Sequence, residues 1–332
     1  MMPSARAGRP LLMAMLFLTG SAGAGDPALV LEATIPLPNV GGRIDHMAVD
    51  LAHDRLFVAE LGNGTVDSID IARRKRSGRI TGLKEPQGIG YLPARDMIVV
   101  ASAGDGSVRL YAGATLMPAG TVDLGDDADN VRIDTATGTV LVGYGAGSIA
   151  VIDPARPAKI GDLPLRAHPE GFRYDVSAGR LYVNVPDRQQ IDVLDRGTGR
   201  QIAAWSSPDM RSNYPMALDG AAGRIAVGYR SPARLVEMKA ADGTVTGSIP
   251  LCDDTDDVSF DAKRSRYYVS CGEGAVDVIN RTPDGLVHRD RIKTASGART
   301  SLFVPELDRL FVAARAGWFG GDAAILVFRP AS

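Results

Sequence analysis

Asp257-Val-Ser-Phe-Asp261, Arg266-Tyr-Tyr-Val-Ser270 and Ala275-Val-Asp-Val-Ile279 are three short runs of strand-forming residues with turn residues between them. Apolar, β-branched and aromatic residues bounded by Gly, Asp and Pro are typical of short strands. The unit recurs seven times, and the residue that ends its first run marks each copy: Asp50, Leu92, Asp134, Asp175, Asp219, Asp261 and Pro305. Successive marks lie 41 to 44 residues apart. Such a period, with about four strands per repeat, predicts an all-β, seven-bladed β-propeller.

The two ends of the chain are expected to complete one blade together. The last copy stops after its third run, Ala324-Ile-Leu-Val-Phe328, and has no fourth run behind it. Near the other end, Ala33-Thr-Ile-Pro-Leu37 closely resembles Gly247-Ser-Ile-Pro-Leu251, the fourth run of an internal copy. We therefore predict that the N-terminal strand joins the last blade and closes the ring, which removes exposed sheet edges.

The first 24 residues have the pattern of a secretory signal peptide. Arg6 and Arg9 precede an apolar run from Leu11 to Leu18, and the small residues Ala22 to Ala24 follow it. We expect a Sec-type signal at residues 1–24 and one propeller domain at residues 25–332. The apolar run is too short for an ordinary membrane span. The predicted location is the periplasm or the exterior, with no membrane span after cleavage.

Composition limits the partners. The chain has 38 Gly and 20 Pro, which suits a turn-rich β protein, and a formal net charge of −2, which argues against general binding of polyanions. The basic run Arg73–Arg76 is short and lacks the sustained basic stripe that nucleic-acid binding needs. We expect no nucleic-acid partner, and we expect a monomer whose partner is a small molecule or a periplasmic protein.

The two cysteines, Cys252 and Cys271, both belong to the sixth copy. They fall at the same end of one predicted hairpin, which favours a disulfide in an oxidising compartment, worth about 3 kcal/mol on the chain-entropy model. Two free thiols packed at strand ends are the alternative.

The loops that enter the innermost strands of a propeller meet at one mouth of the central channel. Here they supply four carboxylates at one repeat position, and two of the four histidines of the chain lie there too. The predicted ligand-binding residues at this mouth are Asp45, His46, Gln87, Asp129, Asn130, His168, Glu170, Asn213, Tyr214, Asp256, Asp257 and Arg299. An alternative is that the Asp and Asn side chains only cap turns and bind backbone amides.

A divalent metal at the same mouth is a further interpretation. Carboxylates and imidazoles around an open position can bind Ca²⁺, Mn²⁺ or Zn²⁺ and activate water, with His46, His168 and Glu170 as the predicted ligands. Arg299 is the cationic group at this position. Asp256 and Asp257 are its expected neighbours, unless it is free to hold a substrate carboxylate or phosphate.

Motifs for several enzyme classes are missing from the sequence. It contains no GxSxG, no Walker or dinucleotide fingerprint that opens a helix, and no CxxCH haem site. No nucleophile is recognisable, and an electron-transfer role would need a cofactor that a partner carries. No cofactor is therefore assured, and a divalent metal is the one under consideration.

The repeats resemble the YVTN family, the YncE-like group of exported seven-bladed propellers. The resemblance rests on Leu181-Tyr-Val-Asn184 and its equivalents, on Ala150-Val-Ile-Asp153, and on Pro86-Gln-Gly88 before the first run. It covers the whole chain after the signal peptide and is specific for fold. Proteins similar to this family include binding proteins, accessory factors, dehydrogenase subunits and lactonase-like hydrolases, and none of their functional residues matches a motif here.

Three functions follow as hypotheses. The first is an exported binding or accessory protein that holds a ligand or partner protein at the channel mouth. The second is a metal-dependent hydrolase or lyase that acts on a small ester or lactone. The third is a propeller subunit of a periplasmic redox complex, for which an apolar patch near Trp318 and Phe319 would be the docking surface.

Overall fold

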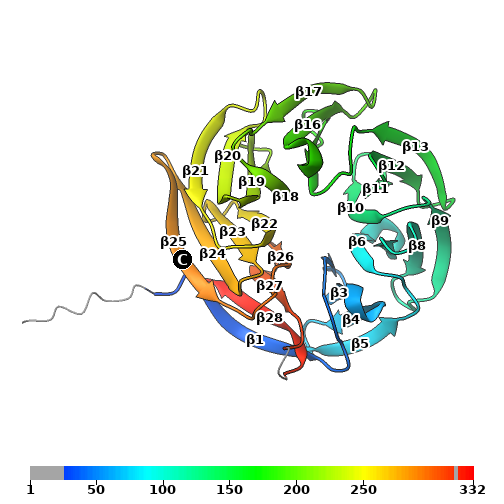
Figure 1. Ribbon diagram of the computed structural model, residues 1–332. Coiled ribbons are helices and arrows are strands. Elements are labelled where there is room, and N and C mark those ends of the chain that lie inside the picture. The colour runs from blue at the N-terminus through cyan, green and yellow to red at the C-terminus, as the bar shows by residue number, and fades with distance from the viewer. Residues whose placement is uncertain (1–25, 318–320) are drawn as a thin grey trace, which may run out of the picture.

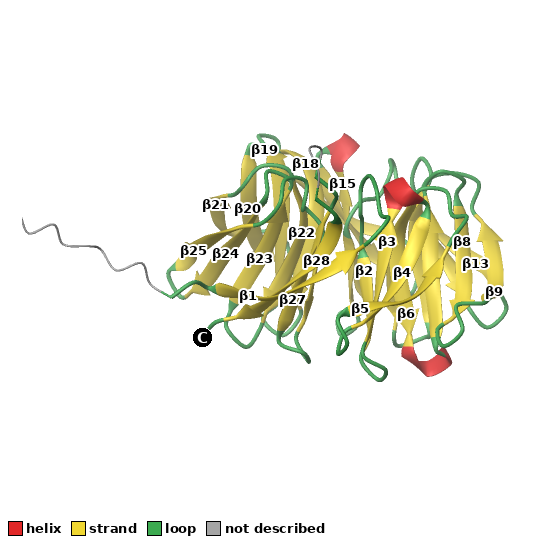
Figure 2. Ribbon diagram, turned by 90° about the horizontal axis from the view of Figure 1, so that it is seen from below, coloured by secondary structure: helices red, strands yellow, loops and turns green. Residues whose placement is uncertain are grey.

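The computed structural model describes residues 26–317 and 321–332, and within them the chain forms seven four-stranded antiparallel sheets arranged as a ring (Figure 1). The prediction of a seven-bladed propeller is confirmed. Each of the first six blades is built from four consecutive strands. In side view the strands run between two faces of the ring, and loops cover both faces (Figure 2).

The strand bounds follow the predicted period. The first three blades are β2 (Met47–Asp50), β3 (Arg55–Glu60), β4 (Thr65–Asp70), β5 (Lys75–Ile80); β6 (Pro86–Leu92), β7 (Met97–Ser102), β8 (Ser107–Ala112), β9 (Pro118–Asp123); and β10 (Ala128–Asp134), β11 (Thr139–Tyr144), β12 (Ser148–Asp153), β13 (Ala158–Pro164). The next three are β14 (Phe172–Asp175), β15 (Arg180–Val185), β16 (Gln190–Asp195), β17 (Gln201–Ser206); β18 (Arg211–Asp219), β19 (Arg224–Ser231), β20 (Ala233–Lys239), β21 (Val245–Pro250); and β22 (Thr255–Asp261), β23 (Arg266–Cys271), β24 (Ala275–Thr282), β25 (Gly285–Lys293).

The seventh blade combines both ends of the described chain. Its strands are β26 (Ser301–Val304), β27 (Arg309–Ala314), β28 (Ala323–Pro330) and β1 (Leu29–Leu37), in the order β1-β28-β27-β26. Ile35 is opposite Ile325 in this pairing. The predicted closure by the N-terminal strand is therefore confirmed, and β1 lies along the outside of β28 in Figure 1.

Seven hydrophobic clusters hold the ring together, one between each pair of neighbouring blades. In the cluster between the seventh and first blades, Ile35 and Phe311 pack with Leu56 and Ile69, and all four are fully buried. The second strand of each blade is apolar on both faces because it has a neighbouring blade on either side. That arrangement explains the continuous apolar runs in the sequence.

An aspartate at the end of the first strand stabilises the following turn in five blades. Its Oδ1 accepts a backbone N–H two or three residues later, at Ala52, Ala136, Ala178, Ala222 and Arg264. This is the Asx-turn role of aspartate. The residue type that marks the repeat in the sequence is therefore a turn former.

Cys252 and Cys271 are joined by a disulfide, with their Sγ atoms 1.97 Å apart. Cys271 is the last residue of β23, and Cys252 lies in the loop that leads into β22. The described part of the chain contains no helix with the length and hydropathy of a membrane span.

We expect the substitution Ile35→Ala to lower the free energy of unfolding by about 2–5 kcal/mol, because it removes a fully buried side chain from the interface that closes the ring. Leu31→Ala in the same strand is the matched control. Leu31 is 52% exposed, so its truncation should change stability by about 0.5 kcal/mol or less. Urea unfolding would measure both, and equal losses would contradict the importance of this interface.

Candidate functional site

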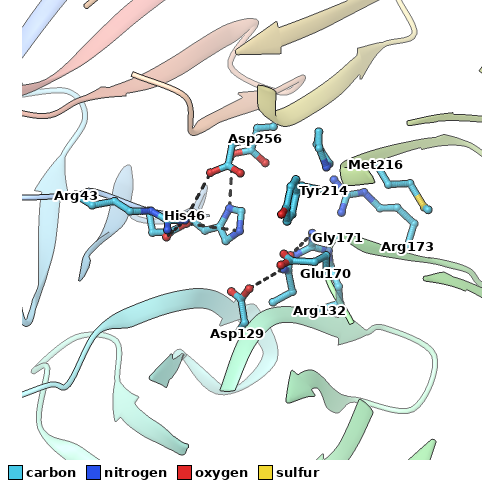
Figure 3. Close-up of a pocket in the computed structure, with 14 residues that line it drawn as sticks. Arg43, His46, Asp129, Arg132, Glu170, Gly171, Arg173, Tyr214, Met216 and Asp256 are labelled. Atoms are coloured by element: carbon cyan, nitrogen blue, oxygen red, sulfur yellow. Dashed lines mark hydrogen bonds and ion pairs between the residues drawn. The ribbon is translucent and has the colours of Figure 1, made fainter. Parts of the chain in front are cut away.

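Two adjoining cavities occupy one mouth of the channel. The outer cavity, about 260 Å³, is lined by Arg43, Gln87, Asp127, Asp129, His168, Glu170, Tyr214, Arg230, Asp256 and Arg299. The inner cavity, about 30 Å³, shares Arg43, Asp129, Glu170, Tyr214 and Asp256 with it, and adds Asp45, His46, Asn130, Arg132, Gly171, Arg173, Pro215, Met216 and Asp257. Figure 3 shows the residues of the inner cavity around a common space. The two cavities therefore contact all the predicted ligand-binding residues except Asn213.

Four of the first strands begin earlier than the sequence indicated, and each carries a β-bulge at the mouth. The register shifts lie between Pro86 and Ile89, Ala128 and Val131, Asn213 and Met216, and Thr255 and Asp257. Bulges redirect side chains next to binding sites. The predicted residues of these blades are therefore held by strand backbone, where we expected loops.

Two glycines permit the close approach of neighbouring blades at the mouth. A Cβ atom on Gly88 would lie 2.0 Å from the carbonyl oxygen of Asp129, and one on Gly171 would lie 2.4 Å from that of Tyr214. Any larger residue would displace those backbones. Gly88 and Gly171 therefore help to fix the positions of Asp129 and Tyr214 in the cavity wall.

Asn213 is the one predicted residue that lies elsewhere. Its side chain is fully buried and donates to the Asn184 Oδ1 atom at 3.1 Å and to the Gln190 carbonyl at 3.0 Å. Because the bulge in β18 follows it, Asn213 turns toward the neighbouring blade while Tyr214 faces the cavity. The prediction of Asn213 as a ligand contact is replaced by a structural role.

Arginines neutralise the carboxylates on one side of the mouth. Arg299 lies 3.0 Å from both Asp254 and Asp256, and Arg230 reaches Asp256 at 2.5 Å. Arg43 lies 2.7 Å from Asp45 and 3.6 Å from Asp256, and so lies between these two carboxylates. The predicted pairing of Arg299 with Asp256 is thus confirmed, while its second partner is Asp254 and not Asp257. Arg230 was not predicted, because it lies near the end of β19, the second strand of its blade.

Asp256 is largely buried among these groups, with 11% of its side chain exposed, and opposing charges act on its pKa. Burial raises the pKa of Asp256 and the charge of Asp45 raises it further, while Arg299, Arg230 and Arg43 lower it, so that it stands at about 6. The neighbouring Asp257 binds a backbone amide, because its Oδ2 accepts a hydrogen bond from the N–H of Ser301 at 2.9 Å. The capping interpretation therefore fits Asp257 among the mouth carboxylates.

His46 is surrounded by negative charge. Its Nδ1 lies 3.6 Å from Asp257 and its Nε2 lies 3.7 Å from Asp45. Burial alone would lower the pKa of His46, but Asp257, Asp45 and Asp129 outweigh it and raise the pKa to about 10. His46 is therefore a cation at neutral pH and a poor metal ligand in that state.

The carboxylates on the opposite side of the mouth have no arginine partner within 4.0 Å in the described residues. One ligand atom each of Asp129, His168 and Glu170 lies within 4.8 Å of the others. Burial, Asp129 and Asp256 raise the pKa of Glu170 to about 9. The metal group proposed from the sequence is thus altered: Asp129, and not His46, accompanies His168 and Glu170.

A second group of metal-ligand type, Asp50, His53 and Asp96, lies away from the mouth. Arg55 already fills it, with its guanidinium 2.6 Å from both Asp50 and Asp96. Trp318 and Phe319, predicted as a docking surface, lie outside the described residues.

Two half-buried arginines, Arg132 and Arg173, line the inner cavity, and neither was predicted from the sequence. Arg132 Nε and Arg173 Nη1 donate to the same carbonyl oxygen, that of Phe172, at 3.1 and 3.0 Å. Burial lowers the pKa of Arg173 to about 9, and the charge of Arg132 contributes to this shift. The only sequence signal was the recurrence of Arg two residues before the marking Asp, in Asn130–Asp134 and Gly171–Asp175.

Comparisons with known proteins support the fold alone. No family model matches the chain, and no curated protein matches it. Its structure is similar to a chain of the hydrazine synthase of Kuenenia stuttgartiensis, with a TM-score of 0.76 and 17% identity, covering 95% of this chain and 99% of that one. It is also similar to a chain of a mitotic checkpoint complex, with a TM-score of 0.78 and 12% identity, covering 98% and 100%.

We expect the stability that His46 contributes to depend on pH. A raised pKa means that protonated His46 stabilises the folded state fully below about pH 6.5, and that this stabilisation is lost as the pH rises toward about 10. His46→Gln should therefore lower the free energy of unfolding by roughly 1–3 kcal/mol at pH 6.5 and by much less at pH 10. Urea unfolding at both pH values tests this, and a loss that does not change with pH would contradict it.

Proposed function

We propose that this chain is an exported propeller of the YVTN type that binds a small molecule bearing a carboxylate in the channel mouth, and that it acts as a binding protein and not as an enzyme. The single observation that carries the proposal is the pair Arg132 and Arg173. Two cationic groups meet at one carbonyl oxygen at the floor of a cavity that opens to solvent.

The charge of this pair is not balanced by a close carboxylate. No acidic oxygen lies within 4.0 Å of Arg132 or Arg173 in the part of the chain that the structure describes, and Asp257 acts on both, and Asp129 on Arg132, only from a greater distance. Arg132 makes three hydrogen bonds, all to neutral oxygens. Charges removed from bulk water are normally paired, so these two half-buried arginines support binding of an external anion.

Arg173 is the group better placed to bind that anion. In the described part of the chain its guanidinium makes one hydrogen bond, through Nη1, so most of its five N–H donors remain available. A guanidinium recognises a carboxylate through two parallel hydrogen bonds. The inner cavity, about 30 Å³, has room for such a terminal group and for little more.

The rest of the ligand would occupy the outer cavity. That space, about 260 Å³, is lined by Asp129, Glu170 and Asp256 on the one hand and by the Tyr214 ring on the other. Arg230 stacks on Tyr214, with its guanidinium carbon 4.2 Å from the ring centre, and so holds the ring in place. Arg43, Arg230 and Arg299 line the same space and pair with Asp256, so these walls favour a polar group at the other end of the ligand.

Export is supported by the sequence pattern of residues 1–24 and by the disulfide. Arg6, Arg9 and the apolar run from Leu11 to Leu18 lie in residues 1–24, outside the described residues. The disulfide between Cys252 and Cys271 suits an oxidising compartment such as the periplasm.

We expect at least one compound in a panel of acetate, succinate, glutamate and other C2–C6 carboxylates to raise the Tm of the protein, and we expect Arg173→Gln to weaken its binding about 30-fold or more. The reason is that truncating one partner of a buried charge pair costs about 2–5 kcal/mol. Arg173→Lys should retain part of the affinity, because it keeps the charge and loses the planar fork. Thermal unfolding followed by titration calorimetry would measure both effects.

Arg234→Gln is the matched control, since this arginine bonds to Ser248 on the outer part of the ring and contacts neither cavity. It should bind the same carboxylate as the wild type does. The proposal fails if no carboxylate raises the Tm, or if Arg173→Gln binds as tightly as the control.

A metal-dependent hydrolase or lyase is the second candidate, and the group formed by Asp129, His168 and Glu170 favours it. In that case Arg132 and Arg173 would hold a carboxylate of the substrate, Asp129, His168 and Glu170 would hold the metal, and the metal would supply Lewis-acid chemistry for hydrolysis of an ester or lactone. Turnover of small lactones that a chelator abolishes and added metal restores would select this function over simple binding.

A further inference from the structure

We propose that Asp129, His168 and Glu170 bind a divalent cation of the Zn²⁺ or Mn²⁺ type at the channel mouth. The inference goes beyond the binding of a carboxylate, and its test uses the metal alone, so either proposal can fail without the other. Asp129 comes from β10, and His168 and Glu170 from the loop that enters β14. Two neighbouring blades therefore supply the three ligands.

Asp129 shows the clearest need for a partner. Its side chain is buried, with 7% of the residue exposed, and its Oδ1 has no hydrogen-bond partner among residues 26–317 and 321–332. Its Oδ2 accepts one long bond, from the Asn130 Nδ2 at 3.3 Å. Leaving a buried carboxylate oxygen unpaired is costly, and a bound cation would satisfy it.

His168 has the orientation expected of a metal ligand. Its Nδ1 lies 2.7 Å from the carbonyl oxygen of Gly145, and because a carbonyl can only accept, Nδ1 carries the hydrogen. In the neutral ring, Nε2 then has the lone pair through which an imidazole coordinates a cation. Metal-bound histidines typically donate their other N–H to a carbonyl or carboxylate in this way. Asp127 Oδ2, 3.7 Å from Nδ1, adds negative charge on the same side.

Glu170 completes the group. Within the described residues its carboxylate has neither an ion pair nor a hydrogen bond, although Arg43, Arg230 and Arg299 neutralise the acidic groups across the mouth. Figure 3 shows Glu170 and Asp129 on the same side of the cavity, away from Arg43. One side of the mouth thus has arginines paired with its carboxylates, while on the other side no arginine of the described residues lies within 4.0 Å of the carboxylates of Asp129 and Glu170.

The ligand set favours one class of ion. One imidazole nitrogen and two carboxylate oxygens suit Zn²⁺ or Mn²⁺, whereas Ca²⁺ prefers six to eight oxygen ligands. Ligands about 2.1 Å from a tetrahedral ion lie about 3.4 Å apart. The present separations, up to 4.8 Å, therefore need only small side-chain movements. Three protein ligands would leave one position open to the outer cavity.

We expect chelator-treated wild-type protein, without an affinity tag, to bind one Zn²⁺ or Mn²⁺ per chain and to melt at a higher temperature with the ion. Asp129→Asn and His168→Gln should each weaken binding on the order of 100-fold. His53→Gln, in the group that Arg55 already fills, is the matched control and should bind like the wild type. Titration calorimetry and elemental analysis after dialysis would give affinity and stoichiometry.

Asp129→Asn has nearly the shape of the wild-type residue and can keep its contact with Asn130, so it decides the result if His168→Gln does not fold. The inference is overturned if the wild type binds no stoichiometric ion, if Asp129→Asn binds as tightly as the wild type, or if His53→Gln alone loses binding. Displacement of Zn²⁺ by an equal concentration of Ca²⁺ would contradict the class of ion.

Discussion

Apolar packing between neighbouring blades is the interaction on which the whole molecule depends. A four-stranded blade with two apolar faces cannot bury both by itself, so each blade needs a neighbour on either side. The seven inter-blade clusters meet this need only because the ring is closed, which the pairing of β1 with β28 achieves. The mouth depends on the same closure, since its side chains come from several blades and no single blade holds more than a few of them.

Closing the ring also concentrates charge. The first strands of the blades converge on one axis. Because the repeat places acidic residues at the beginning of these strands, several carboxylates come close together and repel one another. The structure meets this repulsion differently on the two sides of the channel. Arg43, Arg230 and Arg299 balance one side, while Glu170 on the other side has a raised pKa and can stay protonated. The mouth is therefore polar throughout, but its two sides differ in how their carboxylates are balanced. A ligand or ion would bind there in one orientation.

The fold could be predicted from the sequence because the repeat period, the turn-forming aspartates and the matching terminal strands are all local or periodic signals. The position of the mouth followed from the same register. The direction of individual side chains could not be predicted, because it depends on bulges that have no recognisable sequence pattern. The bulge after Asn213, for example, turns that side chain into the interface between two blades. Arg132 and Arg173 were missed because an arginine inside a strand normally faces solvent, and only closure of the ring turns this face into a channel. Arg230 reaches the mouth from the second strand of its blade, whereas the prediction considered only residues that lead into the first strands.

The junction of β1 with β28 also bears on folding. Residues 29–37 are made long before their partners, residues 323–330, and the pairing between them spans most of the described chain. Contacts of such long range slow folding because the intervening chain has to be ordered first. Until then the nascent ring is an open arc with an unpaired strand edge and a bare apolar face at its ends, the kind of surface that chaperones protect.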